Sequence, residues 1–230
     1  MKLGGFQKTS LLDFPDMVSC IVWTVGCNFR CPFCYNKSVV EGKVELIPEG
    51  DVFDFLEKRK GLLDGVVISG GEPFLQKDIA VFCDNVKKLG YLIKIDTNGM
   101  FPDELKELVD KKLVDYVSMD VKAPKKKYDK LAGVKVDISK IEKSIDVIRG
   151  DAPGYEFKTT FAPGLLKKED IVEVAKWLEG SKNFYLQQFR NNPPLVSSEF
   201  DKVAPYDKEY ILETFEAIKS YFKNCSVRGV

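Results

Sequence analysis

The chain of 230 residues contains no histidine, and its charges balance, with 35 lysine and arginine residues against 35 aspartate and glutamate residues. The lack of histidine excludes every structural zinc site that combines cysteine with histidine. The lack of net charge argues against a dominant basic surface for nucleic acid or for anionic lipid. We therefore expect no nucleic-acid partner, and any protein partner must be recognised through shape and local patches.

Long apolar runs are also absent. No segment approaches the roughly 18 apolar residues needed to span a bilayer, and the opening Met1–Phe6 lacks the apolar core of a signal peptide. The six cysteines are irregularly spaced, unlike the framework of a disulfide-rich secreted domain. We expect a cytoplasmic chain without membrane contact.

The length of the chain suffices for one domain that buries roughly 70% of the unfolded surface, so a single domain is predicted over residues 1–230.

Short β-branched runs alternate along the chain with longer segments of helical periodicity, separated by glycine, proline and asparagine. This alternation predicts a parallel sheet covered by helices. The predicted strands are Val18–Val25, Gly65–Ser69, Leu92–Thr97, Tyr116–Asp120, Glu156–Ala162 and Phe184–Phe189; the predicted helices are Glu49–Lys60, Gln76–Leu89, Pro102–Lys112, Ile138–Arg149, Lys167–Leu178 and Asp207–Phe222. Six strand–helix pairs, rather than eight, favour an α/β partial (β/α)6 barrel. An open doubly wound sheet is the alternative.

Three cysteines lie within eight residues of one another. Cys27, Cys31 and Cys34 form the pattern C-x3-C-x2-C directly after the first predicted strand. Iron–sulfur clusters are held by cysteine thiolates, and a cubane cluster has four irons, so this loop leaves one iron without a protein ligand. An open metal position is typical of a reactive site. The other three cysteines, Cys20, Cys83 and Cys225, are expected to be buried, inert thiols.

Polar motifs follow the next three predicted strands. They are Ser-Gly-Gly-Glu-Pro at 69–73, Asp-Thr-Asn-Gly at 96–99 and Met-Asp-Val-Lys at 119–122. Because the carboxyl ends of parallel strands share one edge of a sheet, these motifs and the cysteines are expected to meet there. Asp96 and Asp120 would then repel each other unless a cation lies between them or one of them is protonated.

The cysteine pattern and the three strand-end motifs together resemble the radical S-adenosylmethionine (SAM) superfamily. The resemblance implies a [4Fe–4S] cluster on the three cysteines, whose fourth iron binds the amino and carboxylate groups of SAM. It also implies that the cofactor is contacted by Gly70, Gly71, Glu72, Asp96, Asn98, Asp120 and Lys122. Similar motifs bind a monovalent cation in the pyruvate formate-lyase activating enzyme, so the resemblance predicts such a cation at Asp96, Thr97 and Asp120. Segments 158–164 and 186–190 would border the adenosine.

The opening Gly4–Pro15 resembles activating proteins of anaerobic ribonucleoside-triphosphate reductase. That resemblance implies that flavodoxin or ferredoxin supplies an electron, that SAM is cleaved to a 5′-deoxyadenosyl radical, and that this radical takes a hydrogen from a glycine of the partner reductase. Two alternatives remain open. One is a radical SAM enzyme acting on a small molecule, resembling 7-carboxy-7-deazaguanine synthase. The other is a non-catalytic iron–sulfur electron carrier, which would not require the strand-end motifs.

Overall fold

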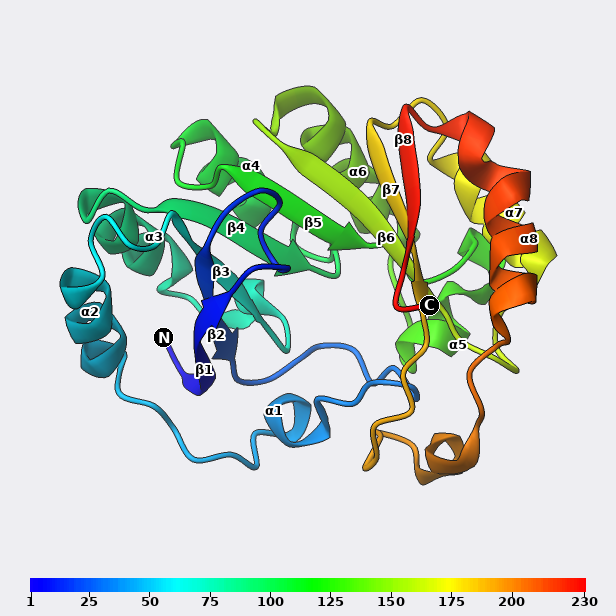
Figure 1. Cartoon of the computed structure of the whole chain (residues 1–230), viewed down its shortest axis with the longest axis horizontal. Coiled ribbons are helices and arrows are strands. Elements are labelled where there is room, and N and C mark those ends of the chain that lie inside the picture. The colour runs from blue at the N-terminus through cyan, green and yellow to red at the C-terminus, as the bar shows by residue number, and fades with distance from the viewer.

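The computed structural model describes residues 1–230 and contains one curved sheet of eight strands, arranged in the order β1 to β8 (Figure 1). The strands are β1 Leu3–Ser10, β2 Ser19–Thr24, β3 Gly65–Gly70, β4 Leu92–Thr97, β5 Tyr116–Asp120, β6 Tyr155–Phe161, β7 Asn183–Gln188 and β8 Asn224–Arg228. From β2 to β8 all neighbours are parallel, whereas β1 is antiparallel to β2. Strands β1 and β8 do not pair with each other, so the barrel stays open.

The longer helices cover the outer side of the curved sheet, whereas the short α1 lies off the sheet in the segment that follows β2 (Figure 1). The helices are α1 Lys37–Glu41, α2 Glu49–Lys58, α3 Ile79–Lys88, α4 Pro102–Asp110, α5 Tyr128–Ala132, α6 Ile138–Asp151, α7 Lys168–Trp177 and α8 Lys208–Ile218, with short 3-10 turns at Pro73–Leu75, Lys125–Lys127, Ser198–Lys202 and Lys219–Tyr221. Each long helix buries one apolar stripe; in α3 the stripe includes Ile79, Phe82 and Val86. No helix is both long enough and apolar enough to cross a bilayer.

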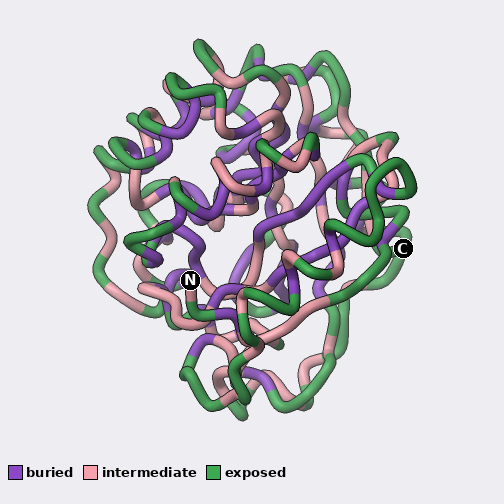
Figure 2. Tube along the Cα trace, turned by 90° about the vertical axis from the view of Figure 1, so that its left-hand side faces the viewer, coloured by how far each residue is buried: buried purple, intermediate pink, exposed green.

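One apolar core of 50 buried residues includes residues from Leu3 to Phe222, and Figure 2 shows the buried stretches gathered in the interior of the molecule. Cys20 on β2 and Cys83 on α3 belong to it and are fully buried, while Cys225 on β8 is half-buried. Burial raises the pKa of each of these three thiols to about 12. They are therefore protonated at neutral pH and poorly reactive, as the sequence predicts.

The six predicted strands are confirmed as β2 to β7, and the six predicted helices as α2, α3, α4, α6, α7 and α8. The prediction omitted both edge strands. β1 contains Gly4 and Gly5, and no residue of β8 is fully buried, so neither strand has the continuous apolar run that marked the inner strands. The run Lys125–Lys127 forms a 3-10 turn with no buried residue.

Candidate active site

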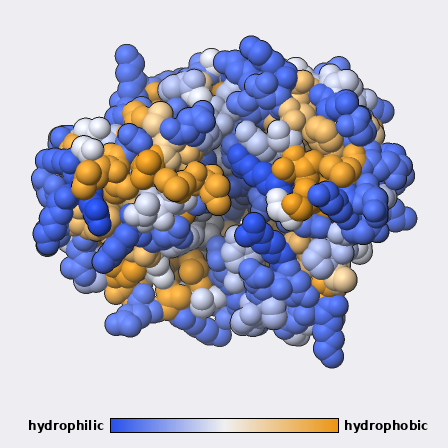
Figure 3. Space-filling model, viewed as in Figure 1, coloured by the Kyte–Doolittle hydropathy of each residue, from blue (hydrophilic) through white to orange (hydrophobic).

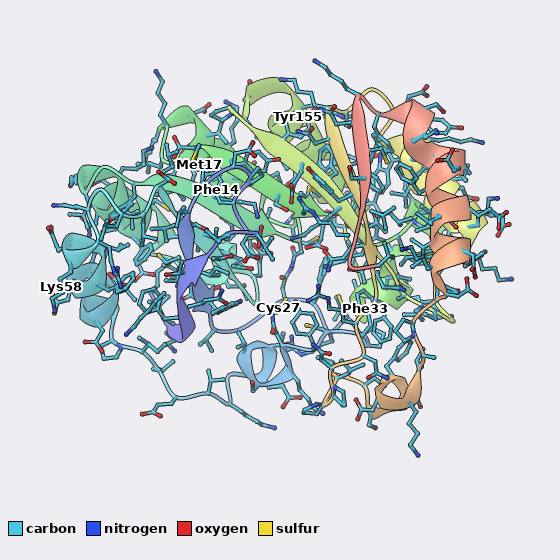
Figure 4. The ribbon with its side chains drawn as sticks, in the orientation of Figure 1. Phe14, Met17, Cys27, Phe33, Lys58 and Tyr155 are labelled. Carbon is cyan, nitrogen blue, oxygen red and sulfur yellow. The ribbon has the colours of Figure 1, made fainter.

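The inner side of the sheet encloses a cavity of about 630 Å³. Figure 3 shows it as a polar hollow between two hydrophobic areas of the surface. The segment that follows β2 runs along the carboxyl ends of the strands, and Figure 4 shows Cys27 and Phe33 of this segment on that side of the sheet. Of the residues predicted to form the site, the cavity is lined by Cys27, Cys31, Cys34, Gly70, Gly71, Asp96, Thr97, Asn98, Asp120 and Lys122. The fold thus brings together residues from four separate loops.

The cysteine loop, residues 25–36, has no regular secondary structure and is held by backbone hydrogen bonds to distant segments. The Gly26 N–H donates to the Val39 carbonyl (2.9 Å), the Arg30 N–H to the Ala132 carbonyl (2.7 Å), and the Cys34 carbonyl accepts from the Val196 N–H (2.9 Å). These contacts fix the loop across the carboxyl ends of the strands.

The three thiols of the loop are buried or half-buried in the cavity wall. Burial raises the pKa of Cys27 to about 11 and that of Cys31 to about 12, and it also raises the pKa of Cys34. The nearby Lys122 ammonium acts in the opposite direction on the pKa of Cys31 and Cys34, because it favours the thiolate. Iron must therefore displace a proton from each sulfur when a cluster binds.

The donor set fits an iron–sulfur cubane. No three cysteine, aspartate or glutamate side chains converge on a single metal-ion position. A cubane does not require such convergence, because each thiolate binds a different iron. Phe29 and Phe33, both nearly fully buried, lie in the same loop and line the cavity beside the sulfurs. Apolar neighbours of this kind limit the access of water to a cluster.

The glycine pair after β3 packs directly against the cysteine loop. Gly70 has a φ of +119°, and a Cβ atom on it would lie 2.3 Å from the Thr24 backbone nitrogen. A Cβ on Gly71 would lie 1.8 Å from the Gly26 carbonyl oxygen. The Glu72 N–H donates to that same Gly26 carbonyl (2.8 Å). Only glycine fits at these two positions, and their backbone borders the cavity.

Glu72, predicted to contact the cofactor, does not line the cavity and is fully buried behind it. Its carboxyl group accepts hydrogen bonds from the Phe74 N–H (3.2 Å), the Thr97 hydroxyl (2.9 Å) and the Asn98 N–H (2.7 Å). Burial raises the pKa of Glu72 to about 7, although the three hydrogen-bond donors act to lower it. The Asn98 side chain in turn donates to the Asn28 side chain (2.8 Å) in the cysteine loop. Glu72 therefore positions the loop after β4, which reaches the cysteines.

Asp96 and Asp120 face the cavity together with three lysines. We call these five residues the strand-end cluster: Lys94, Asp96, Asp120, Lys122 and Lys158. Lys94 Nζ lies 2.7 Å from Asp96 Oδ1, and Lys122 Nζ lies 3.1 Å from Asp120 Oδ1. Lys158 Nζ lies 3.7 Å from the Asp96 carboxylate and 3.6 Å from the Asp120 carboxylate.

The lysines determine the charge state of both carboxylates. Burial alone would raise the pKa of Asp96, but the charges of Lys158 and Lys94 outweigh it, and the pKa falls below its usual range. Lys122 and Lys158 lower the pKa of Asp120 in the same way. Both carboxylates are therefore ionised and already paired with cations. The prediction of a monovalent metal cation at Asp96, Thr97 and Asp120 is accordingly not supported, and the Thr97 hydroxyl donates to Glu72 instead.

Sequence reasoning missed several charged residues of the cavity. Lys94 and Glu156 are almost fully buried and line it, as does Arg228 on the unpredicted β8. The Arg228 guanidinium binds Glu156 through two contacts of 2.9 Å and lies 3.4 Å from the centre of the Tyr185 ring. Lys94 precedes Asp96 by two residues, and Glu156 precedes Lys158 by two. Since side chains alternate along a strand, that spacing indicated a shared face.

The chain is similar in sequence to an archaeal protein and in fold to solved bacterial structures. A protein of Methanocaldococcus jannaschii, provisionally named a glycyl-radical enzyme activating enzyme, is 34% identical over 99% of this chain and 96% of its own length. The fold resembles that of Streptococcus suis SuiB bound to S-adenosylmethionine (TM-score 0.69, 18% identity, 91% of this chain), of which the chain spans about half, 49%. It also resembles a domain of pyruvate-formate lyase-activating enzyme from Bacteroides vulgatus (TM-score 0.58, 16% identity, 72% of this chain and 99% of the other).

A family model also matches this sequence, and it covers most of the residues that line the cavity, though not those of β7 and β8. The match runs over residues 21–178, from β2 through the cysteine loop and the strand-end cluster to the end of α7. By this match and by the full-length similarity to the archaeal relative, the chain belongs to the radical SAM superfamily.

Proposed function

We propose that this radical SAM enzyme is an activase that generates a glycyl radical on a partner enzyme, in particular on an anaerobic ribonucleoside-triphosphate reductase. Membership of the superfamily implies a [4Fe–4S] cluster and SAM as cofactors. The observation that carries the proposal is the cysteine triad at an open cavity, in a chain similar over its whole length to a protein provisionally named a glycyl-radical enzyme activating enzyme. The single domain over 1–230, the cytoplasmic location and a flavodoxin or ferredoxin donor are part of the same proposal.

Each part of the cavity has a role in this proposal. Cys27, Cys31 and Cys34 would hold the cluster, which supplies the electron that cleaves the sulfonium bond of SAM and releases the 5′-deoxyadenosyl radical. The backbone at Gly70 and Gly71 can approach the methionine amino group closely. The strand-end cluster carries one more ammonium group than carboxylate groups, so it suits the carboxylate end of the cofactor. The protein's task is to hold these groups still and to exclude water.

The cavity rim favours a protein substrate over a small molecule. Leu11 and Leu12, in the loop between β1 and β2, are 70% and 90% exposed, and Leu12 also lines the cavity. The loop is anchored, because Phe14 is buried against Val67 and Ile21 and its ring contacts Tyr116. Two exposed leucines on an anchored loop beside the cavity suit contact with the surface of a partner protein. A pocket for a small molecule does not need them.

The experiment is anaerobic reconstitution with iron and sulfide, followed by SAM, a reductant and the candidate reductase. We expect 5′-deoxyadenosine and a glycine-centred radical detected by electron paramagnetic resonance. Deoxyadenosine without a radical on any glycyl partner, but with turnover of a pterin, would favour the small-molecule alternative. No deoxyadenosine at all would favour the electron carrier.

A rim variant sharpens this test. Leu11→Ser should lower the yield of glycyl radical by about fivefold or more, because an exposed apolar contact at the centre of an interface contributes over ~1 kcal/mol, and Leu11 itself does not line the cavity. Formation of deoxyadenosine without partner should not change. Leu62→Ser is the matched control, since Leu62 is 63% exposed and does not line the cavity. Equal activation by all three proteins would exclude the rim from partner contact.

A further inference from the structure

Lys158 is the one member of the strand-end cluster that contacts both carboxylates. Lys94 pairs with Asp96 alone and Lys122 with Asp120 alone. The Lys158 ammonium lies 3.7 Å from one carboxylate and 3.6 Å from the other, so it is placed between the ends of β4 and β5. Its side chain is only 15% exposed. It therefore occupies the position where two like charges would otherwise repel each other.

The sheet sets this geometry before any ligand binds. Lys158 on β6 is in register with Asp120 on β5, and Asp96 on β4 is in register with Ser118, two residues before Asp120. Residues two apart on a strand share a face, so Asp96, Asp120 and Lys158 all point into the cavity. Neighbouring strands are ~4.8 Å apart, which lets a lysine stem span one strand and reach the second carboxylate.

We propose that the Lys158 ammonium serves as a built-in monovalent cation of the cofactor site, so that this chain needs neither potassium nor sodium there. The two carboxylates have the arrangement that invites a metal cation, and a side-chain cation already fills the space between them. The proposal rests on the proposed cofactor site but not on the identity of the partner enzyme. It assigns Lys158 a positioning role, because it acts on Asp96 and Asp120 and through them on the shape of the site.

The wild-type protein provides the first test. SAM affinity of the reconstituted holoenzyme, measured by anaerobic equilibrium dialysis without reductant, should be the same in potassium, sodium and choline chloride at equal ionic strength. The thermal unfolding midpoint of the chain in these salts should also agree. A specific gain in potassium or sodium, in either measurement, would overturn the proposal. The unfolding measurement needs no SAM, so it stays informative even if the proposed function fails.

Three substitutions of Lys158 distinguish the effect of its charge from the effect of the space that its side chain fills. Lys158→Ala removes the ammonium and opens room for an ion, so SAM affinity in choline chloride should fall about tenfold or more, and potassium or sodium should restore it in part. Lys158→Met removes the charge but fills the space, so its affinity should fall without being restored. Lys158→Arg keeps the charge and should retain independence of the salt used.

The matched control is Lys87→Ala. Lys87 Nζ lies 2.8 Å from an Asp115 carboxylate oxygen, so its removal also breaks an ion pair, but neither residue lines the cavity. It should show no dependence on the salt used. If Lys158→Ala bound SAM as the wild type does, or lost affinity that neither ion restored, Lys158 would not be the replacement for a cation and the proposal would be wrong.

Discussion

The two halves of the site are built differently. The cysteine loop has no regular structure, and its thiols are neutral because burial raises their pKa. The strand-end cluster lies on three neighbouring parallel strands, and its carboxylates are ionised and paired. The groups proposed to orient the cofactor are thus fixed by the sheet, whereas the thiols proposed to bind iron lie on a loop and would gain their charge only on metal binding.

The largest effect that distinguishes the two halves is expected from the removal of a thiol. Replacing any one of Cys27, Cys31 or Cys34 with alanine should abolish the cubane cluster, because in the proposed site each thiolate would be the sole protein ligand of its iron. Iron and sulfide content and the visible absorption after reconstitution measure this. Cys83→Ala is the control, since Cys83 is buried in α3 away from the cavity, and its iron content should equal that of the wild type. Equal losses in all four variants would mean that the ligands are misassigned.

The contact between the cysteine loop and the loop after β3 can be broken at Gly71. Gly71→Ala should lower the free energy of unfolding by more than about 3 kcal/mol, because its Cβ would lie 1.8 Å from the Gly26 carbonyl oxygen and the cysteine loop must move. Chemical denaturation of the apo chain measures it.

Gly150→Ala is the matched control for that substitution. Gly150 lies within α6, and a Cβ added there would meet no atom within 4 Å, so alanine should stabilise the chain by up to about 1 kcal/mol. If Gly71→Ala were as stable as the wild type, the glycine pair would not couple the two loops.

A smaller effect comes from pH acting on Glu72. The folded state raises the pKa of Glu72 from 4.5 to about 7, so between these values the folded chain holds a proton that the unfolded chain has lost. Its contribution to stability is present in full below pH 4.5 and is lost as the pH rises through about 7, by up to ~3 kcal/mol. Glu72→Gln cannot titrate, so the difference in unfolding free energy between pH 5 and pH 8 should shrink. An unchanged difference would assign the titration to other groups.

Most of the fold could be predicted from the sequence because the inner strands have continuous apolar runs. β3, with Val66, Val67 and Ile68 fully buried, is the simplest case. The edge strands could not be found in this way, since β1 and β8 each pair with one neighbour only, have few buried residues and contain polar residues. Finding β8 required the contact between Arg228 and Glu156, which joins residues 72 positions apart in the chain. No local pattern encodes such a contact.

The motifs predicted which loops meet, but not what each side chain does there. Nothing in the sequence Ser-Gly-Gly-Glu-Pro indicates that Glu72 points away from the cavity, because its direction depends on the donors of Thr97 and Asn98 on the next strand. Likewise, Lys158 could be placed at a strand end but not between two carboxylates, because that position depends on the register of three strands. Spacing along the chain predicts proximity, and packing decides orientation.

The unpaired edges of the sheet have a mechanical consequence. A closed barrel has a radius set by its strand number and stagger, and it cannot widen unless its ladder breaks. Here β1 and β8 do not pair with each other, so no strand ladder has to break for the distance between these two edges to change. The same sheet can therefore accommodate ligands of different size while all seven of its strand pairings are kept.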